Sequence, residues 1–78
     1  MIKRKLEGFY TEANRNGFGG KFVTIDQLKG NLKKFFEVTD RTVDLYVRES
    51  AKLGLIQNYG MRWKIVELDG GIKNGNNS

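Results

Sequence analysis

The sequence lacks both cysteine and histidine. Without cysteine, disulfides and thiolate metal sites are excluded, and without histidine the chain loses the commonest metal ligand and general base. A chain of 78 residues forms one domain at most and buries proportionally little surface. A partner subunit is the one common aid to stability that stays open. The absence of cysteine fits an intracellular, cytoplasmic protein.

Groups that could support catalysis are also scarce. The two serines, Ser50 and Ser78, have no base to activate them. The carboxylates are scattered, and no two of them are placed like an acid–base pair. We therefore expect no enzyme activity, no metal, no cofactor and no small-molecule ligand.

Long apolar segments are absent as well. The basic start MIKRKLEGFY is not followed by the apolar stretch of a signal peptide. No segment has the roughly 20 apolar residues of a membrane span, so we expect no membrane association. The sequence is instead basic, with a net charge of +5 and a pI of about 9.7. A small basic domain suggests a polyanionic partner, although the charge alone favours nucleic acid only modestly.

The spacing of apolar residues predicts three helices. Residues 2–15 carry an apolar stripe with the helical period. A capping box of Thr and Gln begins a second helix over 24–36. A capping Thr begins a third helix over 39–53, and Gly54 follows as a stop signal.

The rest of the chain predicts strands and a tail. Residues 55–66 indicate a β-hairpin: Leu55-Ile56 starts the first strand, 58–60 supplies the turn, and residues 62–65 alternate between charged and apolar side chains. Residues 21–23 could add a short strand as a partner for this hairpin. The segment 67–78 is rich in Gly and Asn, and we expect it to be a disordered tail after a domain of residues 1–66. The predicted fold class is α+β.

With this order of elements, the chain resembles the winged helix-turn-helix family. The resemblance covers residues 24–66 and is strongest in LKKFFEVTDRTVDLYVRESAKLGLI, residues 32–56. The matching positions are Leu32, Phe36, Val38, Thr39, Arg41-Thr42-Val43, Tyr46-Val47 and Gly54-Leu55-Ile56. The resemblance implies three helices plus a C-terminal hairpin wing over 57–64. It also implies binding to double-stranded DNA, with the third helix in the major groove and the wing on the backbone or minor groove. The short, cysteine-free form is similar to small winged-helix proteins of archaea and their viruses.

Three residues depart from the family pattern. Lys33 replaces a small residue that lets the second and third helices approach, and Glu37 replaces the glycine of the turn. Both departures favour a looser connection between these helices. Ser50 replaces a large apolar residue, which predicts a thinner core beneath the third helix.

The third helix is predicted to have a buried side and a basic side. At about 100° per residue, its apolar residues from Val43 to Leu53 fall mostly on one side. The opposite line consists of Arg41, Leu45, Arg48 and Lys52. The two arginines are candidates for guanine edges, and Leu45 suits a thymine methyl.

The acids of this helix flank the basic line and do not interrupt it. Asp40 lies in the first turn, where a carboxylate favours the helix N-terminus. Asp44 can pair with Arg48 at i+4 or with Arg41 at i−3. Glu49 lies on the other flank.

The remaining candidate DNA contacts come from three places. Thr39 and Thr42 could contact phosphate at the start of the third helix. The wing supplies Tyr59, Arg62 and Lys64, and the second helix supplies Lys29, Lys33 and Lys34 for the backbone. Tyr59 is explained equally well as an exposed aromatic residue of the turn. Together the cations form a basic surface of several elements, as nucleic-acid binding needs.

The sequence therefore predicts sequence-specific binding to double-stranded DNA by a transcriptional regulator. One alternative is a winged helix used for protein interaction, with Leu45 as an anchor. A second alternative, RNA binding, is disfavoured because no exposed aromatic residues are expected on the sheet. The first helix, with Phe9 and Tyr10, could form a homodimer surface, although packing onto the other helices is the first use of its stripe.

Overall fold

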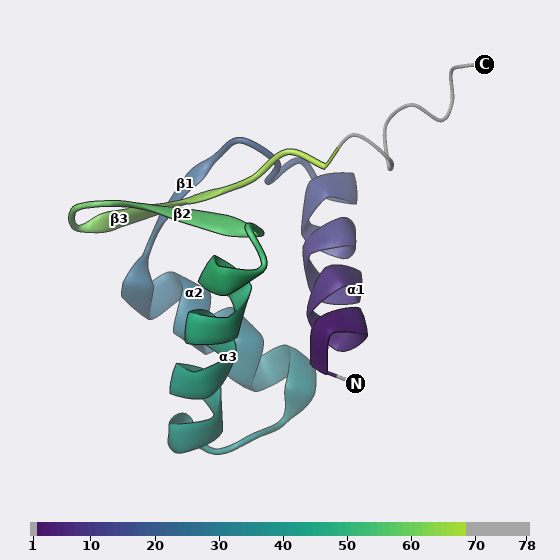
Figure 1. The fold of residues 1–78 in the computed structure, drawn as a ribbon, viewed down its shortest axis with the longest axis vertical. Coiled ribbons are helices and arrows are strands. Elements are labelled where there is room, and N and C mark those ends of the chain that lie inside the picture. The colour runs from purple at the N-terminus through teal and green to yellow at the C-terminus, as the bar shows by residue number, and fades with distance from the viewer. Residues whose placement is uncertain (1, 69–78) are drawn as a thin grey trace.

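The computed structural model describes residues 2–68, which form three helices and one small sheet (Figure 1). The elements in chain order are α1 (Ile2–Arg15), β1 (Phe22–Thr24), α2 (Ile25–Phe36), α3 (Asp40–Lys52), β2 (Ile56–Tyr59) and β3 (Arg62–Ile65). The three predicted helices and the hairpin are all present, which confirms the α+β class. The short strand lies one residue further along than the predicted 21–23.

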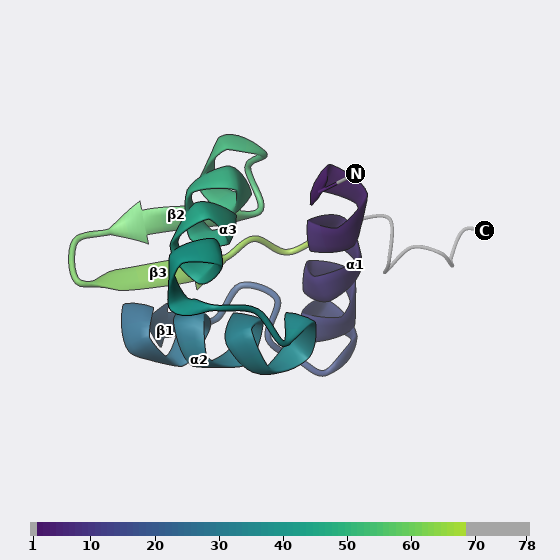
Figure 2. The same ribbon diagram turned by 90° about the horizontal axis from the view of Figure 1, so that it is seen from below.

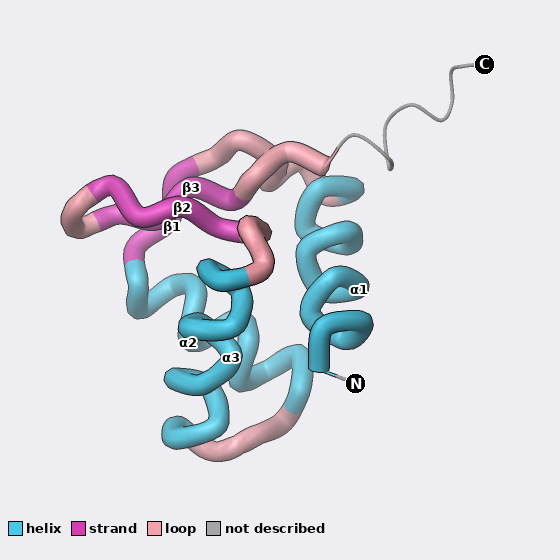
Figure 3. The backbone as a smooth tube through the Cα atoms, in the orientation of Figure 1, coloured by secondary structure: helices cyan, strands magenta, loops and turns pink. Residues whose placement is uncertain are grey.

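The sheet is antiparallel, in the order β1-β3-β2, so that β3 is central. Figure 3 shows the strands lying above α2 and α3, with α1 beside the end of the sheet remote from the hairpin turn. Val23 pairs with Trp63, and Ile56 pairs with Ile65. Paired residues of an antiparallel ladder share a face. These four apolar residues therefore form the inner face of the sheet, which packs against the helices.

The connection between α2 and α3 is short. Figure 2 shows the two helices crossing steeply, and only residues 37–39 join them. Glu37 ends α2 in the left-handed conformation, with φ 53° and ψ 53°, and its N–H donates to the Lys33 carbonyl oxygen at 2.7 Å. Glu37 thus takes the conformation that glycine takes more readily. The looser connection that we expected is not observed.

Gly54 ends α3, as predicted. The Gly54 N–H donates to the Ala51 carbonyl oxygen at 3.1 Å, and the Leu55 N–H donates to the Ser50 carbonyl oxygen at 2.9 Å. This pair of bonds is the Schellman motif, which needs a left-handed residue after the helix. Gly54 supplies it with φ 76°. The chain then turns Leu55 into the core and brings the hairpin back beside α3.

The core lies between the three helices and the inner face of the sheet. Its buried residues are Leu6, Phe9, Tyr10, Val23, Leu28, Leu32, Val43, Val47, Leu55, Ile56 and Ile65. Phe9 and Tyr10 belong to it, so the stripe of α1 is used for packing within the chain. A homodimer through α1 stays a prediction.

The space beneath α3 that we predicted to be thin holds two polar side chains. Ser50 is fully buried, and its hydroxyl donates to the Tyr46 carbonyl oxygen at 2.7 Å. The buried Tyr10 side chain of α1 lies near the Ser50 hydroxyl. Within residues 2–68, the Tyr10 hydroxyl has no partner with hydrogen-bond geometry. Burial raises the pKa of Tyr10 to about 12, and the nearby Ser50 hydroxyl partly opposes this rise.

The end of the described chain is held against α1. The Asn14 side-chain amide donates to the Val66 carbonyl oxygen at 3.2 Å, and the Leu68 N–H donates to Asn14 Oδ1 at 2.9 Å. The first two residues of the expected tail are thus described, and 69–78 lie outside the described residues. No helix in the described part of the chain is both long and apolar enough to cross a membrane.

Candidate nucleic-acid interface

The outer side of α3 carries the four residues predicted for it. Arg41, Leu45, Arg48 and Lys52 are all exposed. Leu45, the one apolar side chain of this line, is 44 % exposed. The buried side of the helix carries Val43, Val47 and Ser50. The predicted division of the helix into a core side and a basic side is therefore confirmed.

Two of the three carboxylates of α3, Asp40 and Asp44, pair with lysines of α2. Lys29 Nζ lies 2.9 Å from Asp44 Oδ1, and Lys33 Nζ lies 2.9 Å from Asp40 Oδ1. The hydrogen bond to Asp44 raises the pKa of Lys29 above its ordinary value. The hydrogen bond from Lys33 holds the pKa of Asp40 below its ordinary value. The expected pairing of Asp44 with an arginine of its own helix was wrong, because the crossing of α2 brings a lysine to it.

These ion pairs separate the basic residues into two groups. Lys29 and Lys33, predicted as backbone contacts, already hold Asp44 and Asp40 of α3. Among residues 2–68, no carboxylate lies at ion-pair distance from Arg41, Arg48 or Lys34. The two arginines therefore keep all their donors for a ligand, beside acids that are already neutralised.

The side-chain contacts at the two ends of α3 are longer than the ion pairs between α2 and α3. The Thr39 hydroxyl accepts the Thr42 N–H at 3.4 Å and donates to Thr42 Oγ1 at 3.2 Å. Thr39 is therefore first of all the N-cap of α3, and its contact with phosphate stays a prediction. At the other end, Lys52 Nζ lies 3.8 Å from Glu49 Oε2. This distance is near the limit of an ion pair and leaves the Lys52 ammonium group largely exposed.

The hairpin turn is shorter than the predicted 58–60 and ends one residue later. Tyr59 and Arg62 form the last pair of the β2–β3 ladder, so the turn consists of Gly60 and Met61. Gly60 has φ 71°, as the first position of a type II′ turn requires. Tyr59 therefore belongs to β2 and not to the tip of the hairpin, where Met61 is 87 % exposed.

The outer face of the sheet is both aromatic and basic. By the ladder register it carries Phe22, Thr24, Gln57, Tyr59, Arg62 and Lys64. Phe22 is 48 % exposed and Tyr59 is 52 % exposed, and their ring centroids lie 5.3 Å apart at 82°. The Arg62 guanidinium carbon lies 5.4 Å from the centroid of the Phe22 ring. The expectation that the sheet has no exposed aromatic residues was wrong.

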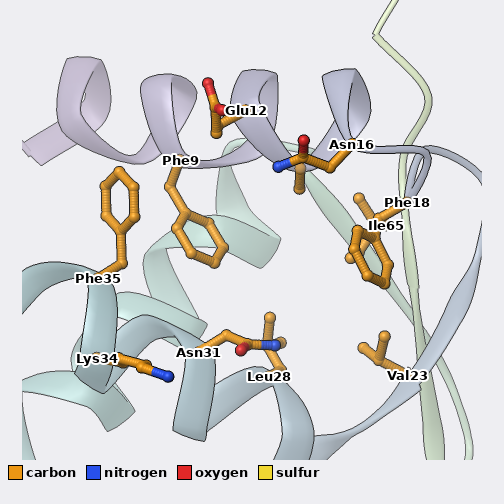
Figure 4. A pocket seen from close by; sticks show the side chains of 11 residues that line it. Phe9, Glu12, Asn16, Phe18, Val23, Leu28, Asn31, Lys34, Phe35 and Ile65 are labelled. Carbon is orange, nitrogen blue, oxygen red and sulfur yellow. The ribbon is translucent and has the colours of Figure 1, made fainter.

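A separate apolar hollow of about 290 Å³ lies between α1 and α2 (Figure 4). Phe9 and Phe35 line one end, and Phe18, Val23 and Ile65 line the other. Lys34 on α2 is the only predicted DNA-binding residue that lines this hollow. The hollow is therefore distinct from the outer line of α3.

Comparisons with protein-family models, with curated proteins and with solved structures gave no match. The functional argument therefore rests on the side chains themselves. They provide two arginines on one helix face that have no ion-pair partner among residues 2–68, and a cationic, aromatic sheet face. Both arrangements suit a polyanion better than a neutral partner.

Proposed function

We propose that the protein binds double-stranded DNA sequence-specifically as a winged-helix domain and regulates transcription by occupying its site. α3 would lie in the major groove, and the β2–β3 hairpin would act as the wing. The observation that carries this proposal is the exposed line of Arg41, Leu45, Arg48 and Lys52 on α3. The short α2–α3 connection followed by a hairpin is compatible with this mode of docking.

The spacing of the two arginines suits base reading. Arg41 and Arg48 are seven positions apart, which is about 10 Å along a helix that rises about 1.5 Å per residue. Base pairs rise about 3.4 Å each, so this span covers about three of them. Each guanidinium can bridge two acceptors of a guanine, and Leu45 between them would meet a thymine methyl.

The acids on α3 do not oppose this proposal. Asp40 and Asp44 are each held by a lysine of α2 at 2.9 Å. Lys34, together with Arg62 and Lys64 of the hairpin, would contact the phosphate backbone. The protein would thus present cations to the DNA and hold Asp40 and Asp44 in internal pairs.

A protein partner fits the same face less well. Leu45 would be its only large apolar anchor on α3, and three cations surround it on the same line. The centres of protein interfaces are depleted in charged residues. Duplex DNA uses both the cations and the leucine, so it is the favoured ligand.

The direct test is a titration of a labelled duplex, selected from a randomised pool, at 50 and 200 mM salt. With about four to six phosphate contacts, affinity should fall roughly 100- to 1,000-fold between these concentrations. Arg48→Lys keeps the charge but loses the bidentate fork, so it should relax sequence preference without changing the salt slope. Arg4→Ala, on α1, removes the same charge elsewhere and serves as the matched control for Arg48→Ala. Absence of binding at 50 mM salt, or equal effects of these two alanine variants, would contradict the proposal.

The roles of helix and wing can be separated in the same assay. Arg41→Ala should relax sequence preference, because Arg41 would contact base edges. Arg62→Ala should weaken all sequences alike, because Arg62 would contact the backbone. Identical effects of the two variants on preference would refute the assigned roles.

A further inference from the structure

We infer that the outer face of the sheet is a second binding site, which takes unpaired bases of single-stranded nucleic acid by stacking on Phe22 and Tyr59. This site goes beyond duplex binding by α3 and does not depend on it. It is built from β1, β2 and β3, and each of the three strands contributes a contact.

The sheet register brings the two rings together. Phe22 on β1 lies opposite Lys64, and Tyr59 on β2 lies opposite Arg62, so both aromatic residues flank the central strand on its outer face. Their rings meet above β3 in an edge-to-face contact with 5.3 Å between centroids. The rings thus form one continuous surface over three strands.

The rings keep free area for a ligand. Each is about half exposed, at 48 % for Phe22 and 52 % for Tyr59. An edge-to-face pair covers the edge of one ring and one face of the other, and the Arg62 guanidinium lies over a Phe22 face, so part of the ring faces stays open. A nucleic-acid base stacks on such a face whatever its identity, because every base has a π-surface.

The charges around the rings match a phosphate backbone. The Arg62 guanidinium lies over the Phe22 ring at 5.4 Å, and Lys64 is on the same face. None of the six residues on this face is acidic, and in the described chain neither cation is in an ion pair. An apolar peptide or lipid chain would use the rings and leave these cations without a partner. A nucleic-acid strand uses both.

Polar groups beside the rings can contact base edges. The Tyr59 hydroxyl donates to Gln57 Oε1 at 3.2 Å, which leaves the Gln57 amide group on the same face. The two ring centroids lie 5.3 Å apart, so the pair offers stacking surface for about one or two bases.

The test is a fluorescence anisotropy titration of labelled oligothymidylate and oligouridylate ten-mers at 50 mM salt. The wild-type protein should bind at least one of them. Phe22→Ala and Tyr59→Ala should each weaken that binding at least about fivefold, since stacking on one ring is worth roughly a 5- to 150-fold change in affinity. Tyr59→Phe keeps the ring and should bind within about twofold of wild type. Preference for one ten-mer would identify RNA or single-stranded DNA as the ligand class.

Two further variants separate stacking from structural effects. Phe35→Ala removes an equally exposed ring from α2 and should leave binding of the ten-mers unchanged. Phe22→Leu keeps apolar bulk without the ring, so it should lose single-strand binding while its thermal unfolding and duplex binding stay near wild type. If neither ten-mer binds, or if Phe35→Ala weakens binding as much as Phe22→Ala, the inference is overturned. Loss of duplex binding in Arg48→Ala, with ten-mer binding kept, would leave it standing, because Arg41 and Arg48 of α3 do not belong to this sheet face.

Discussion

Lys29 and Asp44 form an ion pair of 2.9 Å that joins α2 to α3 beside the proposed reading face. Lys33 and Asp40 form a second pair of the same length at the start of α3. Exposed ion pairs contribute little to folding stability. Their main consequence is the distribution of charge, because they neutralise Asp40 and Asp44 without using the arginines of α3.

Removal of the Asp44 carboxylate should therefore strengthen binding to duplex DNA. In Asp44→Asn, Lys29 would be free to neutralise a phosphate, so the affinity for DNA should rise. The slope of log affinity against log salt concentration should steepen by about one unit, because about one more counterion is released on binding. Anisotropy titrations over a series of salt concentrations measure both quantities. Glu12→Gln is the matched control, since Glu12 pairs with Arg15 at 2.9 Å on α1. An Asp44→Asn variant that binds no better than Glu12→Gln would rule out this role of the pair.

The second pair predicts a pH effect on Asp40. The Lys33 ammonium group holds the pKa of Asp40 below its ordinary value in the folded protein. The pair therefore contributes to stability above the unfolded pKa of Asp40, and this contribution is lost as pH falls through the folded pKa. In Lys33→Met, the pKa of Asp40 should rise towards its ordinary value, as a carboxyl NMR titration would show. Lys34→Met should leave it unchanged, and an equal rise in both variants would show that Lys33 has no specific effect.

Glu37 predicts a gain in stability. Its φ of 53° places a residue with a Cβ atom in the left-handed region, at a cost of about 1–2 kcal/mol. Glu37→Gly removes that cost but adds freedom to the unfolded chain, so the net gain should be about 0.5–1 kcal/mol. Thermal unfolding should then show a rise of a few degrees in Tm. The exposed Glu7→Gly, within α1, should instead lower Tm, and a fall in Tm for Glu37→Gly as well would show that the left-handed conformation carries no strain.

Local signals in the sequence predicted much of the fold. The helical period defined α1, the Thr24–Gln27 capping box defined the start of α2, and Gly54 defined the end of α3. Each of these features involves residues within one or two turns of each other. The outer line of α3 was predictable for the same reason, because one helix fixes the directions of its own side chains.

The features that sequence reasoning missed depend on residues far apart in the chain. Phe22 and Tyr59 meet because β3 lies between their strands. The residues next to each of them in the sequence do not predict this contact. Lys29 reaches Asp44 because α2 crosses α3, whereas i,i+4 spacing had suggested a partner within the helix. The residue type at position 37 did not predict its conformation, since a glutamate takes here the left-handed conformation that glycine usually takes in such a turn.

Tyr10 predicts a loss of stability at high pH. Burial raises its pKa to about 12 in the folded protein, from 10.0 for an ordinary tyrosine. The unfolded chain therefore ionises first, so stability is complete below pH 10 and falls as pH rises towards 12, by up to about 2–3 kcal/mol in total. Tyr10→Phe removes this hydroxyl, which has no hydrogen-bond partner among residues 2–68, so the variant should be at least as stable as wild type at pH 7. Because the variant has no titrating group at this position, it should also lose less stability between pH 9 and 11.5. Urea unfolding at each pH measures the difference. Tyr59→Phe, whose hydroxyl is exposed, should follow the wild-type curve, and a Tyr10→Phe curve parallel to wild type would show that Tyr10 is not the group responsible.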